Sequence, residues 1–549
     1  MQERNGKKMK KILGLVLALL LLLSIAACNK DTKKDDTPAQ SESTGNANTS
    51  NEDTSTGNQK EYVSISIGVS GELGRFLKGL APADNATACD AVFDTVFKPN
   101  PKTHLIESFV LESWDWQDDT TLIMKMKDNV YFSNGEQATA EDLVFSYLSH
   151  FERGSNFLNT CGLVQDQCIV LDTLTAQFKF ERPYINFFDF EVYLNDKSWA
   201  ESVGWDSEEW YKPVGSGPYE CVEYLPGERI TLHARSDYWN KDAGDIYVDE
   251  WIIRCYPDPT TMFMELETGK IDICSATSAD YSRYLKEGGQ GFDCKLIESG
   301  VVNYFCFGYE SIDAFKDKRV REAVACGVNW EELGILSMGD MYVKTNSITP
   351  TNGPLYVDVG DYVFDPERAK TLLAEAGYDN GQLSLKTFMM DSPAYRALCE
   401  GFQFYLNAIG IEVSIEYGDI SSAIAQWVTP GTCNFGFLWV PTGSATFDPY
   451  YSISATDGSS SLWAYVDDAK FQELLAATAY TNDNAVKVAK ARELQQYIRD
   501  EVLLIPYASA VGVVGYNNTL FTSDQISSYV QTSNIYQISK LGMARAWGN

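Results

Sequence analysis

The sequence has few histidines and lacks the common catalytic motifs. Only His104, His150 and His233 occur in its 549 residues, and their spacing is not that of a metal site. The nucleophile-elbow, zinc-protease, P-loop and EF-hand patterns are all missing. With 76 acidic residues, carboxylate pairs of the kind used in glycoside hydrolysis arise by chance and identify nothing. The chain is therefore predicted not to be an enzyme, and neither a cofactor nor a metal ion is expected.

Basic residues are scarce relative to acidic ones. The chain has 44 Lys and Arg residues against 76 Asp and Glu, which gives a formal charge of −32. This balance argues against nucleic acid and against anionic lipid headgroups as partners. Because no run of like charges is longer than a few residues, we expect the acidity to be spread over the surface, where it serves solubility.

The cysteines show no regular pairing pattern. No C-x-x-C occurs, and besides Cys28 there are eleven cysteines, so at least one has no partner within the chain. Several, such as Cys274 and Cys306, stand in apolar runs, where cysteine behaves as a small hydrophobic residue. A disulfide framework is not implied. Cys161 and Cys168 are the one pair close enough in sequence to be considered for a bridge.

The N-terminal segment is typical of an exported protein. A basic start is followed by the apolar run 13–25, which is too short for a transmembrane helix. Cys28 directly follows Ala26 and Ala27, the pattern of a bacterial lipobox. We therefore predict a signal peptide over 1–27 and lipidation of Cys28, with an ordinary signal peptide or an uncleaved anchor as alternatives. All three place the remaining chain outside the cytoplasm, on the cell surface or the periplasmic face of a membrane.

Residues 28–60 are predicted to be a lipidated, disordered linker. Residues 29–60 contain no aromatic residue and no Leu, Ile, Val or Met. Such a segment cannot bury enough apolar surface to offset its ordering entropy. As a flexible coil it would reach about 30 Å. Stable anchoring needs more than one acyl chain, so a multiply acylated Cys28 is expected.

From residue 62 onward, helix and strand patterns are interleaved. Thr139 with Asp142 has the form of a capping box, and Asp365 with Pro366 the form of a helix start. Alternating or apolar runs predict strands at 63–69, 121–127, 219–225, 230–234, 411–415 and 503–507, and helices are predicted from 139, over 366–376, up to 409 and over 485–500. At 44% hydrophobic residues the chain can bury a large core, in two or three domains. The fold class is mixed α/β, without an internal repeat.

Several sequence blocks, read in order, resemble one known family. They are 111–114, 121–127, 130–135, 139–146, 213–219, 226–228, 237–239, 317–323, 365–377, 448–449 and 504–507. In this order and spacing they are similar to the peptide-type (family 5) extracellular solute-binding lipoproteins of bacterial ABC importers. The resemblance implies a two-lobed, periplasmic-binding-protein-like fold of the class II or cluster C type, with an extra subdomain in lobe one. It also implies that a solute is captured between the lobes and delivered to a permease.

The resemblance implies that the chain crosses between the lobes twice. The crossings are expected near 300–307 and 505–512, where a few strand residues would absorb the hinge motion. Lobe one would comprise 61–302, with the extra subdomain at about 90–210, and lobe two 303–507. Residues 508–549 would return to lobe one.

The expected ligand contacts also follow from the resemblance. In peptide-binding members an aspartate three residues before an Asp-Pro pair holds the α-ammonium of the ligand. Here the pair is Asp448-Pro449 and that position is Ala445, next to Ser444, so recognition of a free amino terminus is placed in doubt. Aromatic side chains suit stacking or clamping of a ligand. The candidate ligand-binding residues are Trp439, Ser444, Ala445, Trp463, Trp427, Tyr304 and Glu72.

An oligopeptide is the first expectation for the ligand, and an oligosaccharide or another small solute is the alternative. Two other protein classes remain open from the sequence. A surface-anchored hydrolase would need clustered acids in a cleft, and an adhesion lipoprotein would show a flat apolar patch without a deep cleft. The expected partners are the solute, ABC permease subunits and a membrane reached through the lipid anchor, and the chain is expected to be a monomer.

Overall fold

The computed structural model describes most of the chain between residues 62 and 536. The described ranges are 62–70, 73–77, 86–99, 106–152, 161–241, 246–309, 311–351, 353–379, 381–427, 429, 431–441, 468–532 and 535–536. The predicted signal peptide, the linker and Cys28 lie outside these ranges.

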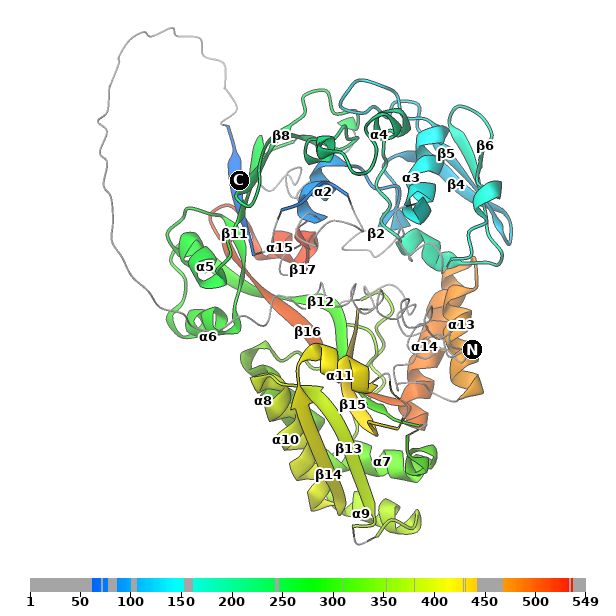
Figure 1. Ribbon diagram of the computed structural model, residues 1–549, viewed down its shortest axis with the longest axis vertical. Helices are drawn as coiled ribbons and strands as arrows, with labels where there is room; N and C mark the ends of the chain where they lie inside the picture. Colours follow the sequence, from blue (N-terminus) through cyan, green and yellow to red (C-terminus); the bar gives the residue numbers. More distant parts are fainter. Residues whose placement is uncertain are drawn as a thin grey trace. The chain divides into compact units, whose positions relative to one another are not determined.

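The largest sheet has eight strands in the order β15-β12-β16-β11-β1-β10-β9-β8 (Figure 1). The strands are β1 (Ser64–Val69), β8 (Tyr219–Leu225), β9 (Arg229–Ala234), β10 (Glu250–Cys255), β11 (Ile273–Ala276), β12 (Phe292–Phe307), β15 (Phe435–Pro441) and β16 (Leu504–Asn517). β1 is parallel to β11, whereas β12 is antiparallel to both β15 and β16. The two longest strands, β12 and β16, therefore connect the two ends of this sheet.

A second sheet has the order β4-β5-β7-β6 and is antiparallel throughout. Its strands are β4 (Leu111–Asp118), β5 (Thr121–Met126), β6 (Ile169–Val170) and β7 (Thr175–Lys179). Leu143 and Tyr147 of helix α3 (Ala140–Glu152) pack on its buried residues Leu122 and Met124. This core lies in the segment for which the sequence predicts an extra subdomain, and the boundaries of that subdomain remain a prediction.

A third group of elements surrounds the parallel pair β13 (Leu383–Met390) and β14 (Ile411–Gly418). Helix α10 (Pro393–Ala408) joins the two strands, as a parallel crossover requires. Its Phe402 ring lies 5.0 Å from Phe305 of β12 and 5.1 Å from Phe435 of β15, measured between ring centroids. The parallel pair and one half of the crossing strands thus share a single aromatic core.

The remaining elements cover these sheets. The helices are α2 (Ala86–Val92), α4 (Lys197–Val203), α5 (Pro259–Glu267), α6 (Ser278–Glu287), α7 (Lys318–Gly327), α8 (Trp330–Met338), α9 (Pro366–Glu375), α11 (Ile420–Trp427), α13 (Ala469–Ala479), α14 (Asn484–Glu501) and α15 (Ser523–Tyr529). The 3-10 helices are η2 (Gln165–Gln167), η3 (Ile185–Asp189), η4 (Glu208–Tyr211), η6 (Asp313–Lys316) and η7 (Gly339–Met341). Two short pairs join β2 (Lys98–Pro99) to β3 (Ile106–Glu107) and β17 (Val530–Thr532) to β18 (Ile535–Tyr536).

Local sequence signals predicted several element ends correctly. The Asp142 carboxylate accepts hydrogen bonds from the backbone N–H and the hydroxyl of Thr139, both at 2.8 Å, at the start of α3. Asp365 caps α9 by accepting from the Arg368 N–H at 2.9 Å, and Pro366 is the first helical residue. The predicted hairpin β8–β9 and the long helix α14 are also present.

Two details of the sequence analysis are changed by the structure. The strand predicted at 503–507 continues to Asn517, because the small and β-branched residues that follow contain no turn signal and pair with both β11 and β12. The bridge considered between Cys161 and Cys168 is not formed; instead the Cys168 thiol donates to the Val164 carbonyl at 3.4 Å. None of the cysteines in the described ranges forms a disulfide.

The Gly-Ser-Gly turn at 215–217 has a packing role, as interpreted from the sequence. A Cβ on Gly215 would lie 2.1 Å from the Val92 carbonyl oxygen, and one on Gly217 would lie 2.5 Å from that of Ala91. Both glycines are therefore needed for the close approach to the end of α2. Between them, the Ser216 hydroxyl accepts a hydrogen bond from the Asp94 N–H at 2.9 Å.

Asp94 connects two of the sequence blocks that carried the family resemblance. Its carboxylate accepts hydrogen bonds from the Tyr238 hydroxyl and the Trp239 indole N–H, both at 2.9 Å. Trp239 also donates to the Ser216 carbonyl at 3.1 Å. Burial raises the pKa of Asp94 from 3.8 to about 7, although the hydrogen bonds from Trp239 and Tyr238 oppose the shift.

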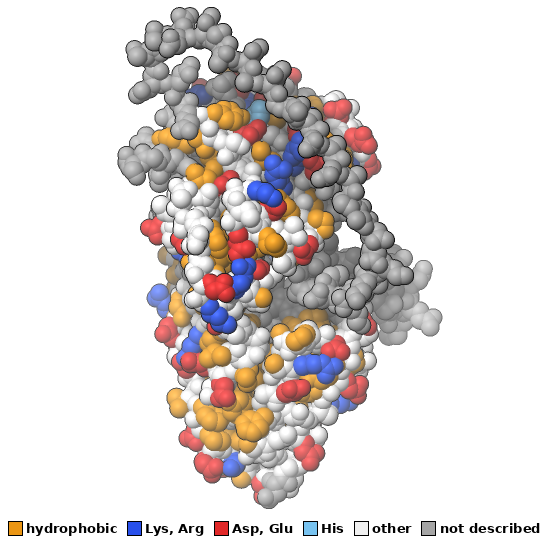
Figure 2. All heavy atoms as spheres, turned by 90° about the vertical axis from the view of Figure 1, so that its left-hand side faces the viewer, with side chains coloured by type: hydrophobic (Ala, Val, Ile, Leu, Met, Phe, Trp, Pro, Cys, Tyr) orange, Lys and Arg blue, Asp and Glu red, His pale blue; other side chains and the backbone are white. Residues whose placement is uncertain are grey.

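The surface carries charges of both signs. Figure 2 shows acidic and basic side chains interspersed with polar and apolar ones on one face of the molecule. This distribution agrees with the expectation that the acidity is spread rather than gathered. None of the described helices combines the length and the apolar character needed to cross a bilayer.

Candidate functional site

The two segments predicted to cross between lobes pair directly with each other. Val301 of β12 lies opposite Ala510 of β16, and Cys306 lies opposite Leu504. The ladder is interrupted twice, between Glu298 and Val301 and again next to Asn303. Gly300, inside the first interruption, has a φ of +73°, a backbone conformation that favours glycine. Such bulges bend a strand pair locally and allow it to change direction.

β15 extends this crossing on the other side of β12. Trp439 lies opposite Asn303 in the antiparallel register of β15 and β12. The strand ends at Pro441, immediately before the segment 442–467, which lies outside the described residues. The backbone of Trp439 is thus placed beside the crossing, while its side chain lies outside what the structure describes.

The other predicted ligand residues fall into two groups. Glu72, Ser444, Ala445 and Trp463 lie outside the described residues, so their roles stay predictions. Trp427 and Tyr304 are described, and both are buried, with 3% and 0% of their surface exposed. The Trp427 indole N–H donates to the Phe388 carbonyl at 2.7 Å, and both residues belong to the core around β13 and β14. Both side chains are buried, and their roles as ligand residues stay predictions.

Two polar groups at the crossing were not selected from the sequence. Asn303 Nδ2 and Ser509 Oγ are both buried, and neither has a hydrogen-bond partner among the described residues. A buried donor without a partner costs about 1 to 3 kcal/mol, so such groups are commonly used by a ligand or water. In the sequence, Asn303 is an isolated polar residue in the apolar run 301–307, and this pattern could have identified it as a candidate.

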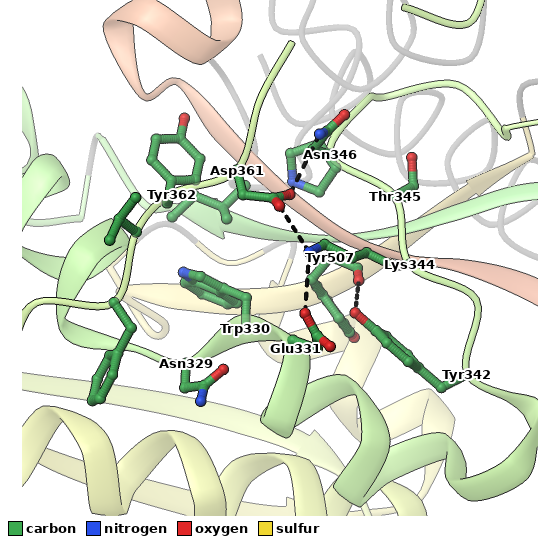
Figure 3. A pocket seen from close by; sticks show the side chains of 14 residues that line it. Asn329, Trp330, Glu331, Tyr342, Lys344, Thr345, Asn346, Asp361, Tyr362 and Tyr507 are labelled. Carbon is green, nitrogen blue, oxygen red and sulfur yellow. Dashed lines mark hydrogen bonds and ion pairs between the residues drawn. The ribbon is translucent and has the colours of Figure 1, made fainter. Parts of the chain in front are cut away.

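A pocket of about 290 Å³ lies beside β16 at its Ile505–Tyr507 end (Figure 3). Its walls come from the start of α8, from the segment 342–346, from 361–364 and from β16. Neither Trp427 nor Tyr304, the predicted ligand residues whose side chains the structure describes, lines it. The pocket is therefore a feature of the second half of the chain that sequence reasoning missed.

Lys344 is the basic side chain at the centre of this pocket (Figure 3). Its ammonium group lies 2.7 Å from Asp361 Oδ2 and 3.1 Å from Glu331 Oε2. The hydrogen bond to Asp361, followed by that to Glu331, raises the pKa of Lys344 despite its partial desolvation. The Tyr342 hydroxyl donates to the Tyr507 carbonyl at 3.2 Å, and burial raises its pKa to about 12. Lys344 is therefore a charged group that is already paired with two carboxylates of its own chain.

No group of three or more His, Cys, Asp or Glu residues within the described ranges could hold a metal ion. Burial raises the pKa of the Cys306 thiol, in β12, well above its ordinary value. A raised pKa disfavours the thiolate, which is the reactive form of cysteine.

Comparison with known proteins identifies related sequences over most of the chain. The family model of the bacterial extracellular solute-binding proteins, family 5 (middle part), matches residues 106–463. The oligopeptide-binding protein AppA of Bacillus subtilis is 26% identical over 359 residues, which cover 60% of this chain and 64% of AppA. The heme-binding protein A of Haemophilus influenzae is 23% identical and covers 96% of this chain and 97% of its own length.

Solved structures show the same fold. The ABC transporter substrate-binding protein CtaP of Listeria monocytogenes superposes with a TM-score of 0.75 at 21% identity, and the superposition covers 88% of this chain and 99% of CtaP. At this identity the likeness concerns the fold alone. The fold is that of the two-lobed, mixed α/β periplasmic binding proteins, as the sequence predicted.

Proposed function

Because the chain belongs to the bacterial extracellular solute-binding proteins of family 5, we propose that it captures an oligopeptide between two lobes and delivers it to an ABC transporter permease. The observation that carries the proposal is the pairing of β12 with β16 on one side and with β15 on the other. A strand pair with two interruptions is a suitable hinge, and β15 leads from it into the segment where the ligand loop is predicted.

The peptide assignment is favoured by the relatives. AppA carries the name of an oligopeptide-binding protein, and a 24% identical protein of Escherichia coli that of a dipeptide-binding protein. Heme-binding protein A, which aligns over nearly the whole chain, is named for a different ligand. Sequence similarity over the whole chain therefore does not identify the solute. The choice of solute depends on the side chains that lie between the two proposed lobes.

We infer that Trp439 and Asn303 contact the solute from neighbouring strands. Asn303 supports this role because its buried amide nitrogen has no partner among the described residues, as expected of a donor reserved for a ligand carbonyl. Trp439 supports it because its backbone is in register with Asn303 and directly precedes the predicted ligand loop. Ser444 and Ala445 would line that loop without offering a charge to an ammonium group.

The location of the protein and its partners are part of the same proposal. The family is extracytoplasmic by its description. We propose that the chain is exported with a signal peptide over 1–27 and held at the membrane by lipidated Cys28, as a monomer that contacts permease subunits. It performs no catalysis in this proposal. Replacing Cys28 by Ala should release the protein from the membrane or leave it unprocessed, while solute binding by the folded part is unchanged.

The solute can be identified on the purified protein. Mass spectrometry of small molecules released by acid extraction should find peptides in stoichiometric amount, and adding them back should raise the melting temperature by mass action. Small-angle scattering should then show a smaller radius of gyration with peptide than without it. Release of a sugar, a heme or a metal chelate in their place would overturn the peptide assignment and keep the family.

A further inference from the structure

Helices α13 and α14 touch a distant part of the chain at the turn that joins them. Both helices pack into the core around β13 and β14, through residues such as Leu474 and Leu494. Ala479, at the end of α13, is instead part of the core of the β4–β7 sheet, and Tyr480 packs against that core. The turn between α13 and α14 therefore joins the hydrophobic core around β13 and β14 to that of the β4–β7 sheet, and these two cores belong to different predicted lobes.

Specific polar contacts accompany this packing. The Arg182 guanidinium lies 4.4 Å from the centroid of the Tyr480 ring, and the Tyr184 ring lies 6.2 Å from it. The Asn482 side-chain amide donates to the Asp119 carbonyl at 2.8 Å. These residues come from the end of β4, from the segment after β7 and from the α13–α14 turn. We call this set of contacts, together with the ion pair described next, the latch.

The ion pair of Lys487 with Asp189 is the buried part of the latch. Lys487 Nζ, on the first turn of α14, lies 2.6 Å from Asp189 Oδ2 at the end of η3. Their side chains are only 6% and 9% exposed. Removing one member of a buried pair leaves an uncompensated charge, which is far more costly than the loss of an exposed pair.

The latch joins the two predicted lobes at a different place from the crossing strands. In Figure 1 the α13–α14 pair lies on the right of the drawing, and β12 and β16 lie to its left. Bending at the interruptions of β12 would move one predicted lobe relative to the other. Contacts made away from the bend must then separate, so opening the lobes requires breaking the latch and exposing Asp189 and Lys487 to water.

We propose that Asp189 and Lys487 are affinity-determining residues that hold the lobes closed without touching the solute. The inference rests on the proposed function, since it assumes that closure and binding are coupled. A protein whose closed form is more populated binds its solute more tightly, because less free energy is used to close it. The latch would thus set the affinity from outside the binding site.

The first test measures closure without any solute. Lys487→Met and Asp189→Asn should each increase the radius of gyration of the solute-free protein in small-angle scattering. The double variant should return toward the wild-type value, because neither buried charge is left unpaired. Lys490→Met is the matched control; Lys490 lies one turn further along α14 and pairs within the helix with Glu493 at 2.7 Å, so this variant should behave as wild type.

The second test measures affinity for the solute extracted from the wild-type protein. By calorimetry each single variant should bind it about tenfold more weakly, a change of about 1.4 kcal/mol, and Lys490→Met should bind it as wild type does. Should the single variants fail to fold, Asn482→Ala removes another contact of the latch without leaving a buried charge, and it should change the radius of gyration and the affinity in the same direction by less. An unchanged radius and an unchanged affinity in folded variants would overturn the inference. Because the scattering test uses no solute, it remains decisive even if the peptide assignment is wrong.

Discussion

Trp439 lies opposite Asn303 in the antiparallel register of β15 and β12, and Asn303 is paired on its other side with Ala508 of β16. Asn303 is thus paired with both β16, the second crossing strand, and β15, the strand that leads to the predicted ligand loop. The buried Asn303 amide nitrogen has no partner among the described residues. This junction is where a bound solute would be coupled to hinge bending.

Asn303→Ala separates a binding role from a structural one. If Asn303 Nδ2 donates to the solute, the variant loses one hydrogen bond, worth about 1 kcal/mol or a fivefold weaker affinity. The free energy of unfolding of the solute-free protein should stay the same or increase, because a buried donor without a partner has been removed. Calorimetry with the extracted solute and urea unfolding without it check the two parts.

The matched control is Thr387→Val in β13. The Thr387 hydroxyl donates to the Phe435 carbonyl at 2.7 Å within the neighbouring core. This variant should lower the free energy of unfolding by about 1 kcal/mol and leave the affinity unchanged. A loss of stability without a loss of affinity in Asn303→Ala would contradict the binding role.

Asp94 should make stability depend on pH in an unusual direction. Burial raises its pKa from 3.8 to about 7. Between these two pH values the folded state holds a proton that the unfolded state has released. The contribution of Asp94 is complete below pH 3.8 and is lost as pH rises toward 7, with a slope of at most about 1.4 kcal/mol per pH unit. Urea unfolding of wild type and Asp94→Asn at pH 4.5 and 7.5 should show the wild type losing stability relative to the variant.

Asp118 supplies the control of opposite sign. The backbone N–H of Thr120, followed by the Thr121 hydroxyl, lowers the pKa of Asp118 to about 2. Its contribution is present above pH 4 and is lost as pH falls toward 2. Asp118→Asn should therefore lower the free energy of unfolding above pH 4, and by the same amount at pH 4.5 and at pH 7.5. For Asp94 itself, the contradicting outcome is an equal dependence of the free energy of unfolding on pH in wild type and Asp94→Asn between pH 4.5 and 7.5. It would show that Asp94 is ionised in the folded protein.

Gly217→Ala should destabilise the fold strongly. The added Cβ would lie 2.5 Å from the Ala91 carbonyl oxygen and 2.6 Å from the Val92 carbonyl carbon, and neither backbone atom can rotate away. We expect a loss of more than about 2 kcal/mol in the free energy of unfolding, at the upper end of overpacking effects.

Gly227→Asn is the corresponding control for Gly217→Ala. Gly227 has a φ of +68° and open space where a Cβ would be. Asparagine tolerates this backbone conformation, so the free energy of unfolding should change by only a few tenths of a kcal/mol. A Gly217→Ala protein as stable as this control would mean that the turn at 215–217 can move away from α2.

The sequence predicted those features that depend on neighbouring residues. The caps at Thr139 and Asp365 are formed by side chains within three residues of their partners. The extension of β16 was missed because its pairing partners lie far away in the sequence. The Lys487–Asp189 pair joins residues 298 positions apart, and no local pattern indicates it. The fold family was nevertheless identified, because ordered blocks over the whole chain carry information that single elements do not.

For the candidate site, residue type alone is a weak indicator, for a physical reason. Trp427 and Tyr304 were selected as aromatic residues, but a buried core and a ligand cleft favour the same residue types. Asn303 is a better indicator because a polar side chain in an apolar strand needs a partner. The position of Trp439 beside the crossing could be anticipated from the family resemblance, since it begins the block that leads to Asp448-Pro449.

The last prediction concerns the amino terminus of the solute. In peptide-binding members of the family, an aspartate stands at the position that Ala445 occupies here. The predicted loop therefore offers no charge to an ammonium group at this position. Burying an ammonium without a counter-charge is costly, and such a site should not select for one. Acetylating the amino terminus of a bound peptide should change its affinity by less than about tenfold, or about 1.4 kcal/mol.

Ala445→Asp tests the same idea in reverse. A new carboxylate without a partner should weaken binding of the acetylated peptide and spare or improve that of the free peptide. Calorimetry on the two matched peptides against both proteins gives the four affinities needed. A hundredfold loss on acetylation in the wild type would mean that another acid holds the ammonium, with Glu72 the first to examine. Glu72→Gln should then abolish the difference between the two peptides, and the argument from Ala445 would be wrong.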